Sequence, residues 1–207
     1  MRAIHLFVLG AAVVLATAAR AEEGPLLIRV RAVYLVPANR SDAIPALSVP
    51  SDAIHVSNKL VVPEVDVSFF FTRNLAVELV LSFPNKHDVT LSGSYIGTVT
   101  HLPPTLVAQW HFLPDFILNP YLGAGVNVTF FTSTNLSVPG VGKLDLSGPS
   151  VGPAAQAGVD VKVAEQWFVN LDAKYVLLRS DVRAGGSKVS SVQVDPWLLG
   201  GGVGFRF

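Results

Sequence analysis

The residues whose side chains could most readily bind a metal or transfer a proton lie close together in the sequence. His87 and Asp88 are adjacent, and His101 follows in the same segment. Imidazole and carboxylate groups can bind Zn²⁺ or transfer protons. A loop histidine beside a carboxylate more often makes a surface hydrogen bond, so we expect no metal site here. The sequence has no cysteine, which excludes disulfides, zinc–thiolate sites, iron–sulfur clusters and a cysteine nucleophile.

An enzymatic function would need groups that the sequence does not bring together. Esterases and acyltransferases require a serine and a histidine close together with an orienting acid. His111 is the last histidine of the chain, so the last three predicted strands cannot offer such a pair. No glycine-rich phosphate loop opens a helix either. We therefore expect neither catalysis nor a cofactor.

Ten charged residues occupy alternate positions within apolar segments, which places them on one face of β-strands. Five are basic and five are acidic: Arg29, Arg31, Lys162, Lys174 and Arg206 against Glu64, Asp66, Glu78, Asp160 and Asp172. Buried charges are unfavourable unless they are paired, and equal numbers of both signs suit a packed interior. We predict an internal salt-bridge network. The alternative is an ion path or a carboxylate pair for acid–base catalysis.

The segments that carry these charges show the period-two alternation of strands. Their other face is apolar, as with Val65 and Val67 on either side of Asp66. We predict eight strands, with boundaries uncertain by roughly 2–4 residues. They cover 26–37, 63–71, 74–84, 104–113, 120–131, 153–163, 166–179 and 191–207.

Composition and connection lengths place these strands in a membrane. Half of the residues are hydrophobic and only 14% are charged, against roughly 25% in soluble domains. Short connections at 72–73, 114–119 and 164–165 alternate with long ones at 38–62, 85–103, 132–152 and 180–190. This pattern is typical of an all-β, eight-stranded antiparallel transmembrane β-barrel with short periplasmic turns and long extracellular loops. We expect it in a bacterial outer membrane, in contact with lipid.

Both ends of the chain carry signals for export. Residues 1–21 combine a basic start, an apolar run and a small-x-small cleavage pattern. We therefore predict a signal peptide over 1–21 and a barrel over 22–207. Phe207 ends an alternating apolar strand, which is the signal that outer-membrane assembly machinery usually reads. The formal net charge is zero, which argues against a nucleic-acid partner.

The inward positions of the upper lumen, on the side of the long loops, look apolar. They are Val33, Leu35, Phe70, Val80, Val107 and Val176. An apolar lining favours a hydrophobic solute. Prolines such as Pro104 and Pro153 stand near the long-loop ends of the strands. Because proline donates no ladder hydrogen bond, we expect the wall to be weakest at that height.

Several motifs, in their order and spacing, are similar to those of one known family. They include Asn74-Leu75-Ala76-Val77-Glu78-Leu79, His101-Leu102-Pro103-Pro104, Gln109-Trp110-His111-Phe112, Pro120-Tyr121-Leu122-Gly123-Ala124-Gly125, Trp167-Phe168-Val169-Asn170-Leu171-Asp172 and Phe205-Arg206-Phe207. The chain resembles the OmpW family of bacterial outer-membrane proteins, which includes AlkL, over nearly all of residues 22–207. The resemblance implies an eight-stranded barrel with a narrow, largely hydrophobic upper channel for small apolar molecules. It also implies a closed polar lower lumen and sideways exit into the membrane.

Two regions bear on a gate in this channel. Members of the family commonly carry a tryptophan-containing stretch before the sixth strand, where this sequence has Pro149-Ser150-Val151-Gly152. If that tryptophan gates the channel, Val151 leaves a wider constriction. The segment 38–62 is unusually apolar through Ile44, Leu47, Val49 and Ile54. It is either a landing surface for an apolar solute or a cluster packed on the rim.

These observations together predict passive passage of small hydrophobic molecules through an outer-membrane barrel. A structural or surface-interaction barrel without transport is the alternative.

Overall fold

Eight long antiparallel strands form a closed barrel in the computed structural model, which describes residues 24–44, 49–57 and 61–207. The strands are β1 (Leu26–Val36), β4 (Val61–Phe70), β5 (Leu75–Ser82), β8 (Thr105–His111), β9 (Leu118–Val138), β11 (Ser150–Lys162), β12 (Trp167–Val176) and β15 (Trp197–Arg206). Each pairs with the next, and β15 pairs with β1 to close the wall. The predicted eight-stranded barrel is therefore confirmed. The predicted signal peptide lies outside the described residues.

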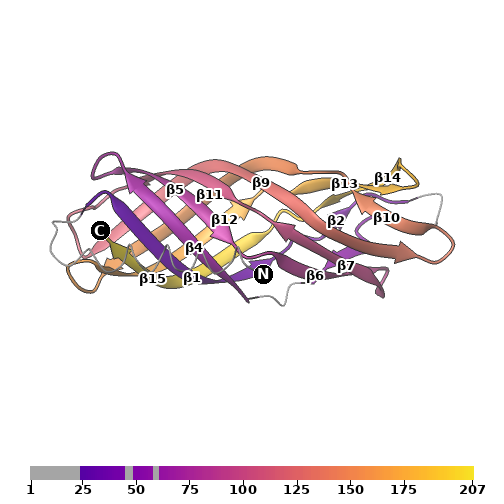
Figure 1. The fold of residues 1–207 in the computed structure, drawn as a ribbon, viewed down its shortest axis with the longest axis horizontal. Coiled ribbons are helices and arrows are strands. Elements are labelled where there is room, and N and C mark those ends of the chain that lie inside the picture. Colours follow the sequence, from indigo (N-terminus) through magenta and orange to yellow (C-terminus); the bar gives the residue numbers. More distant parts are fainter. Residues whose placement is uncertain (1–23, 45–48, 58–60) are drawn as a thin grey trace, which may run out of the picture.

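Short turns gather at one end of the barrel, the periplasmic one, and the C-terminus lies there (Figure 1). Phe207 packs against Phe205 at this end, with ring centroids 4.8 Å apart, and its backbone N–H donates to Leu26. This anchors the last residue in the wall. Its role as an assembly signal stays a prediction.

The long extracellular connections, which were predicted to be loops, form strands of their own. They are β2 (Arg40–Ser41), β3 (Ile54–Val56), β6 (Asn85–Leu91), β7 (Ser94–Leu102), β10 (Gly142–Leu146), β13 (Arg179–Ala184) and β14 (Ser187–Gln193). They continue the wall beyond the outer end of the barrel (Figure 1). Strand β9 spans both tiers, because it pairs first with β8 and β11 and then with β7 and β10. We call this outer tier the extension.

The predicted last strand over 191–207 is corrected by the structure. Its first residues belong to β14, and β15 begins only at Trp197. Asp195 separates the two strands with a positive φ of 33°, and Pro196 follows it. A left-handed residue and a proline both interrupt a hydrogen-bond ladder. The strand therefore ends here, although the apolar–polar alternation of the sequence runs on without a break.

Lipid faces the apolar side of the barrel strands. Leu106, Leu122 and Leu171 are all more than half exposed, whereas the inward residues Val107, Tyr121 and Asn170 beside them are buried. None of the described segments forms a helix of the length and apolarity that spanning a bilayer requires. The alternation of the sequence thus gives each barrel strand one lipid face and one lumen face.

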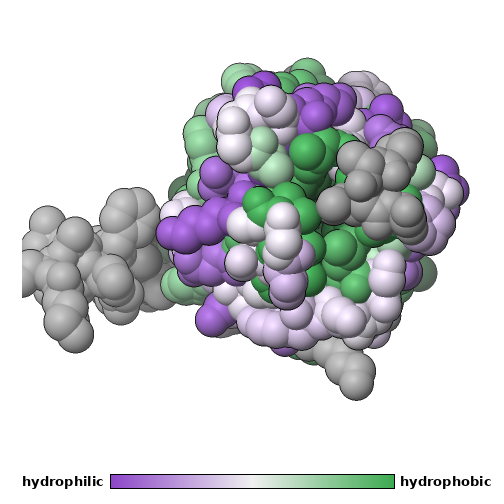
Figure 2. Space-filling model, turned by 90° about the vertical axis from the view of Figure 1, so that its right-hand side faces the viewer, coloured by the Kyte–Doolittle hydropathy of each residue, from purple (hydrophilic) through white to green (hydrophobic). Residues whose placement is uncertain are grey.

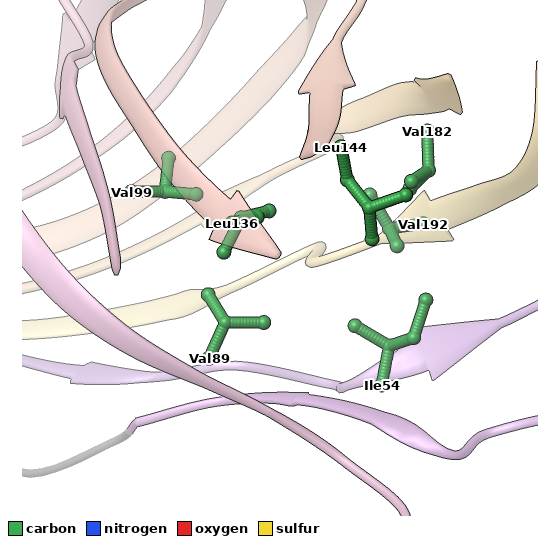
Figure 3. Packing of buried hydrophobic residues seen from close by; sticks show 7 residues of the cluster. All are labelled: Ile54, Val89, Val99, Leu136, Leu144, Val182 and Val192. Carbon is green, nitrogen blue, oxygen red and sulfur yellow. The ribbon is translucent and has the colours of Figure 1, made fainter. Parts of the chain in front are cut away.

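The interior changes character along the long axis. Polar and charged side chains fill the barrel, whereas the extension encloses an apolar cluster. Figure 3 shows this cluster, whose side chains come from strands of the extension and point into one shared interior. Its members are Ile54, Val89, Val99, Leu136, Leu144, Val182 and Val192. The molecule therefore has an ionic tier within the membrane and an apolar tier outside it.

Candidate functional site

Arg29 is the centre of the ionic tier. Its side chain is fully buried, and its Nη1 lies 2.6 Å from Oε2 of Glu78. Nε and Nη2 donate to the two carboxylate oxygens of Asp160 at 3.0 and 2.5 Å. This two-pronged geometry is the strong form of an arginine–carboxylate pair. Through these contacts, Arg29 joins β1 to β5 and to β11 across the lumen.

Arg31 contacts four carboxylates, and Lys174 completes the network. The guanidinium nitrogens of Arg31 lie 3.2–3.5 Å from oxygens of Glu64, Asp66, Glu78 and Asp172. Lys174 Nζ lies 2.5 Å from Glu64 and 3.1 Å from Asp172. Every one of these side chains is buried, so each charge is offset by a neighbour and not by water.

Neutral polar side chains fill the remaining positions of the network, and the sequence reading did not assign them to it. Gln156 donates to Glu78 at 2.9 Å and to Asp172 at 2.8 Å. The Tyr121 hydroxyl donates to Asp172 at 2.8 Å, and Asn170 donates to Asp160 at 2.9 Å. Alternation shows that such residues face inward. Their partners could not be read from it, because the contacts join strands far apart in sequence.

Lys162 and Arg206 lie toward the periplasmic end, below the buried core of the network. Arg206 holds its guanidinium carbon 4.0 Å from the ring centroid of Phe70 and donates to the Gly24 carbonyl at 2.9 Å. Lys162 is half-buried at the end of β11. These two bases therefore occupy the periplasmic rim of the lumen.

Phe70 was expected in the upper lumen, and the structure places it at the opposite end. It packs with Leu27, Ala76 and Phe168 near the short turns. Strand β4 runs from the extracellular side toward the periplasm, so its last inward residue is its lowest one. The alternation of the sequence correctly predicts that Phe70 faces the lumen. Its position along the barrel axis depends on the direction in which β4 runs.

A largely apolar cavity lies directly above the ionic network, and we call it the lower cavity. Its lining includes Val33, Leu35, Val80 and Val176, which were predicted to line the upper lumen, and Glu64 as well. Val107 lies one step deeper, opposite Glu78 in the β5–β8 ladder, and is not among the lining residues. The cavity volume is about 40 Å³.

A second cavity continues upward into the extension, and we call it the upper cavity. It shares Leu35, His101, Leu178 and Pro196 with the lower one, so the two cavities adjoin, and we call the pair the column. Its volume is about 70 Å³, and its lining includes Ile54 and other members of the apolar cluster. Figure 2 shows hydrophobic side chains in the recess at this outer end, among hydrophilic ones on the rim.

The apolar residues of segment 38–62 lie in different environments. Ile54 lines the upper cavity, whereas Ile44 is buried and makes an isolated bridge with Val49. Leu47 lies outside the described residues. Val151 is 65% exposed on the outer face of β11. The expectation that Val151 widens the lumen is therefore wrong, because its neighbour Ser150 occupies the inward, buried position.

His101 lines both cavities and His87 lines the upper one, so neither is the surface residue that was expected. Their rings stack with centroids 5.0 Å apart. Burial lowers the pKa of His87, and burial together with the neighbouring His87 lowers the pKa of His101 to about 4. Asp88 points to the exposed face, because neighbouring strand residues face opposite sides. Within the described ranges, no three His, Cys, Asp or Glu residues form a group that could hold a metal.

The wall has a gap in its hydrogen-bond ladder at the height of the lower cavity. The β5–β8 ladder ends at the Val80–Thr105 pair, and the β6–β7 ladder begins at Asn85–His101. In this described part of the wall, no ladder pair joins residues 81–84 to 102–104. The stretch contains Pro84, Pro103 and Pro104, which lack the N–H that a ladder needs.

A closed antiparallel barrel with a lipid-facing apolar band and a charged interior defines an outer-membrane β-barrel. The chain belongs to the OmpW family, whose family model matches residues 22–207. Like its relatives, it resides in the outer membrane.

The similarity extends over most of each compared chain. An uncharacterized outer-membrane protein, y4mB, of Sinorhizobium fredii is 37% identical over 189 residues, which is 88% of this chain and 80% of that one. Outer membrane protein W of Escherichia coli is 37% identical over 148 residues, or 68% and 70%. The crystal structure of OprG from Pseudomonas aeruginosa superposes with a TM-score of 0.77 at 24% identity, covering 90% of this chain and 97% of that one. That last likeness shows the shared fold.

Proposed function

We propose that this barrel gives passive passage to small hydrophobic molecules through the outer membrane. The observation that carries the proposal is the column of two adjoining, largely apolar cavities above the ionic network. Ligand sites typically combine apolar walls with a few placed polar groups, and this column has that character. An apolar solute entering from the extracellular end would exchange water for these walls at a gain of about 25 cal/mol per Å² buried.

The ionic network blocks the axial route for such a solute. Glu64, a member of the network, also lines the lower cavity, and moving farther down would separate buried ion pairs, which is strongly unfavourable. The gap between β5 and β8 lies at the same height, and no ladder pair of this described stretch holds the wall together there. Sideways exit through this gap is therefore the lower-energy route, and it is part of the proposal.

The cavity volumes imply that the walls must yield during passage. A dry cavity that binds benzene has roughly 150 Å³, whereas the two cavities have about 70 and 40 Å³. The wall of the extension can move apart most easily between β2 and β3, because these two strands are joined chiefly by side chains. Asn39 exchanges two hydrogen bonds with the Val56 backbone, and Ser41 Oγ accepts from the Ile54 N–H at 3.3 Å.

Uptake of an apolar solute by cells with and without the protein tests the proposal. A matched pair of variants sharpens it: Val80→Phe fills the lower cavity, and Leu79→Phe adds the same ring on the lipid face. We expect Val80→Phe to reduce uptake to the level of cells without the barrel, while Leu79→Phe keeps it. Both variants must first show folded barrels by gel mobility without boiling. Normal uptake through a folded Val80→Phe barrel would refute passage through the lumen.

A barrel that interacts at the cell surface without transport is the second candidate. A polar hollow on the extension favours it, with Arg179 and Asp181 in its lining and Lys188 Nζ 2.7 Å from Asp181. Equal uptake with and without the protein would support this candidate.

A further inference from the structure

The ring of His87 leaves one hydrogen-bond acceptor unused inside the extension. Its side chain is 1% exposed, and Nδ1 lies 3.2 Å from the carbonyl oxygen of Ser57. A carbonyl only accepts, so Nδ1 carries the proton and donates. Burial lowers the pKa of this ring, so Nε2 keeps its lone pair. No described residue donates to that Nε2.

A buried acceptor without a donor is costly, and such groups in native structures usually meet a partner. His87 lines the upper cavity. Two other polar side chains of that lining are already satisfied by the protein: the Asn39 amide by Val56, and the Ser180 hydroxyl by the Ser147 carbonyl at 3.1 Å. His87 thus presents an open acceptor in a lining whose other residues are mostly apolar.

His101 adds a second polar position to the same place. Its ring stacks on His87 with an interplanar angle of 10°, and it lines both cavities. His101 is one of the four residues that line both cavities, and the His87 ring packs directly on it. The stacked pair, which we call the histidine pair, therefore lies beside the boundary of the two cavities, with His87 on the upper side.

We propose that the histidine pair selects small apolar molecules that carry a hydroxyl group, such as alcohols and phenols, with the hydroxyl donating to Nε2 of His87. The inference rests on the proposed function, since it names the class of solute that the same column holds best. The apolar body lies against Val89, Val99 and their neighbours. A molecule of the same shape without the hydroxyl leaves Nε2 unpaired and binds less tightly.

Phenol and toluene test this, because they have nearly the same shape and differ in the hydroxyl. The folded full-length barrel in nanodiscs is labelled on histidine nitrogens and valine methyl groups for NMR. The Val89 and Val99 methyl signals report occupancy of the cavity, and the nitrogen signal of His87 reports the hydrogen bond. We expect phenol to bind about five- to tenfold more tightly than toluene, the effect of one net hydrogen bond, and to shift the His87 nitrogen signal.

The variant His87→Phe keeps a ring but removes the acceptor. We expect it to bind phenol no more tightly than toluene, with unchanged toluene binding. His55→Phe, the same exchange at an exposed position of β3, should retain the preference for phenol. A preference that survives in His87→Phe would overturn the inference and leave the proposed function standing. If neither compound perturbed the methyl signals of the unaltered barrel, the proposed function would fail, and the inference with it.

Discussion

Glu78 shows how closely single residues of the ionic tier depend on one another. Its carboxylate accepts from Arg29, Ser68 and Gln156 at 2.6–2.9 Å, and Arg31 lies 3.3 Å away. Removing it leaves two guanidinium groups with fewer partners in a space closed to water. A single deleted member therefore costs much more than the pair contributes over an apolar replacement.

We expect Glu78→Ala to lower the free energy of unfolding by about 3–5 kcal/mol. Urea titration of the detergent-solubilised barrel measures it. Lys143→Ala, which removes an exposed charge of β10, should change that free energy by less than about 0.5 kcal/mol. Small and equal effects at both positions would indicate a hydrated lumen and an open pore.

His101 gives the extension a predicted pH dependence. Its folded-state pKa of about 4 lies below the unfolded value of about 6.5. At pH 7 neither state binds the proton, so the shift contributes nothing there. As the pH falls through 6.5 toward 4, the unfolded state takes up the proton first, so stability is lost in that window.

The variant His101→Gln should therefore lose less unfolding free energy than the unaltered chain between about pH 7 and pH 4.5. The difference between the two proteins isolates this residue from the lumen carboxylates, which titrate in both. An identical loss in both proteins would mean that His101 is protonated as readily in the fold as outside it.

Among the elements, β15 and β1 approach closely at Gly202. A Cβ at this position would lie 2.0 Å from the backbone oxygen of Val30, which cannot move without breaking the ladder. A Cβ at the neighbouring Gly201, on the lipid side, would lie 3.4 Å from a Leu171 methyl group, an ordinary contact. The close approach brings Arg31 of β1 against β15.

We expect Gly202→Ala to destabilise the barrel by more than about 2 kcal/mol through this clash, and Gly201→Ala to change stability by less than about 0.5 kcal/mol. Unfolding in urea and gel mobility without boiling measure both. If Gly202→Ala were as stable as Gly201→Ala, the strands would not approach as closely as the register indicates.

The barrel strands could be predicted from the sequence because alternation reports the two faces of a strand directly. The inward positions of Arg31, Glu78 and Lys174 follow from it. The height of Phe70 also needs the direction of its strand. The strands of the extension could not be predicted in the same way, because they lie in the long connections between barrel strands, which are interpreted as loops. Pairing such as His87 with His101 depends on register, which a single sequence does not give.

The whole molecule combines two interiors with opposite chemistry. The ionic tier closes the membrane-spanning barrel, and the apolar column in and below the extension ends on it. Between them, the wall between β5 and β8 lacks ladder pairs over residues 81–84. Under the proposed function, a hydrophobic solute enters this column from outside and leaves sideways into lipid.

Closing the gap with a disulfide tests this account most directly. The register of the β5–β8 ladder, continued upward from Val80–Thr105, places Ser82 opposite Pro103. The chain has no cysteine of its own, so a Ser82→Cys, Pro103→Cys double variant holds one defined pair. A control pair, Leu79→Cys with Leu106→Cys, joins residues already opposite each other in the ladder.

Uptake of an apolar solute is measured in oxidised and reduced forms of both proteins. We predict that oxidation abolishes uptake through the gap pair, that reduction restores it, and that the control pair conducts in both forms. Normal uptake through the oxidised gap pair would contradict lateral exit and favour a continuous axial route through the ionic tier.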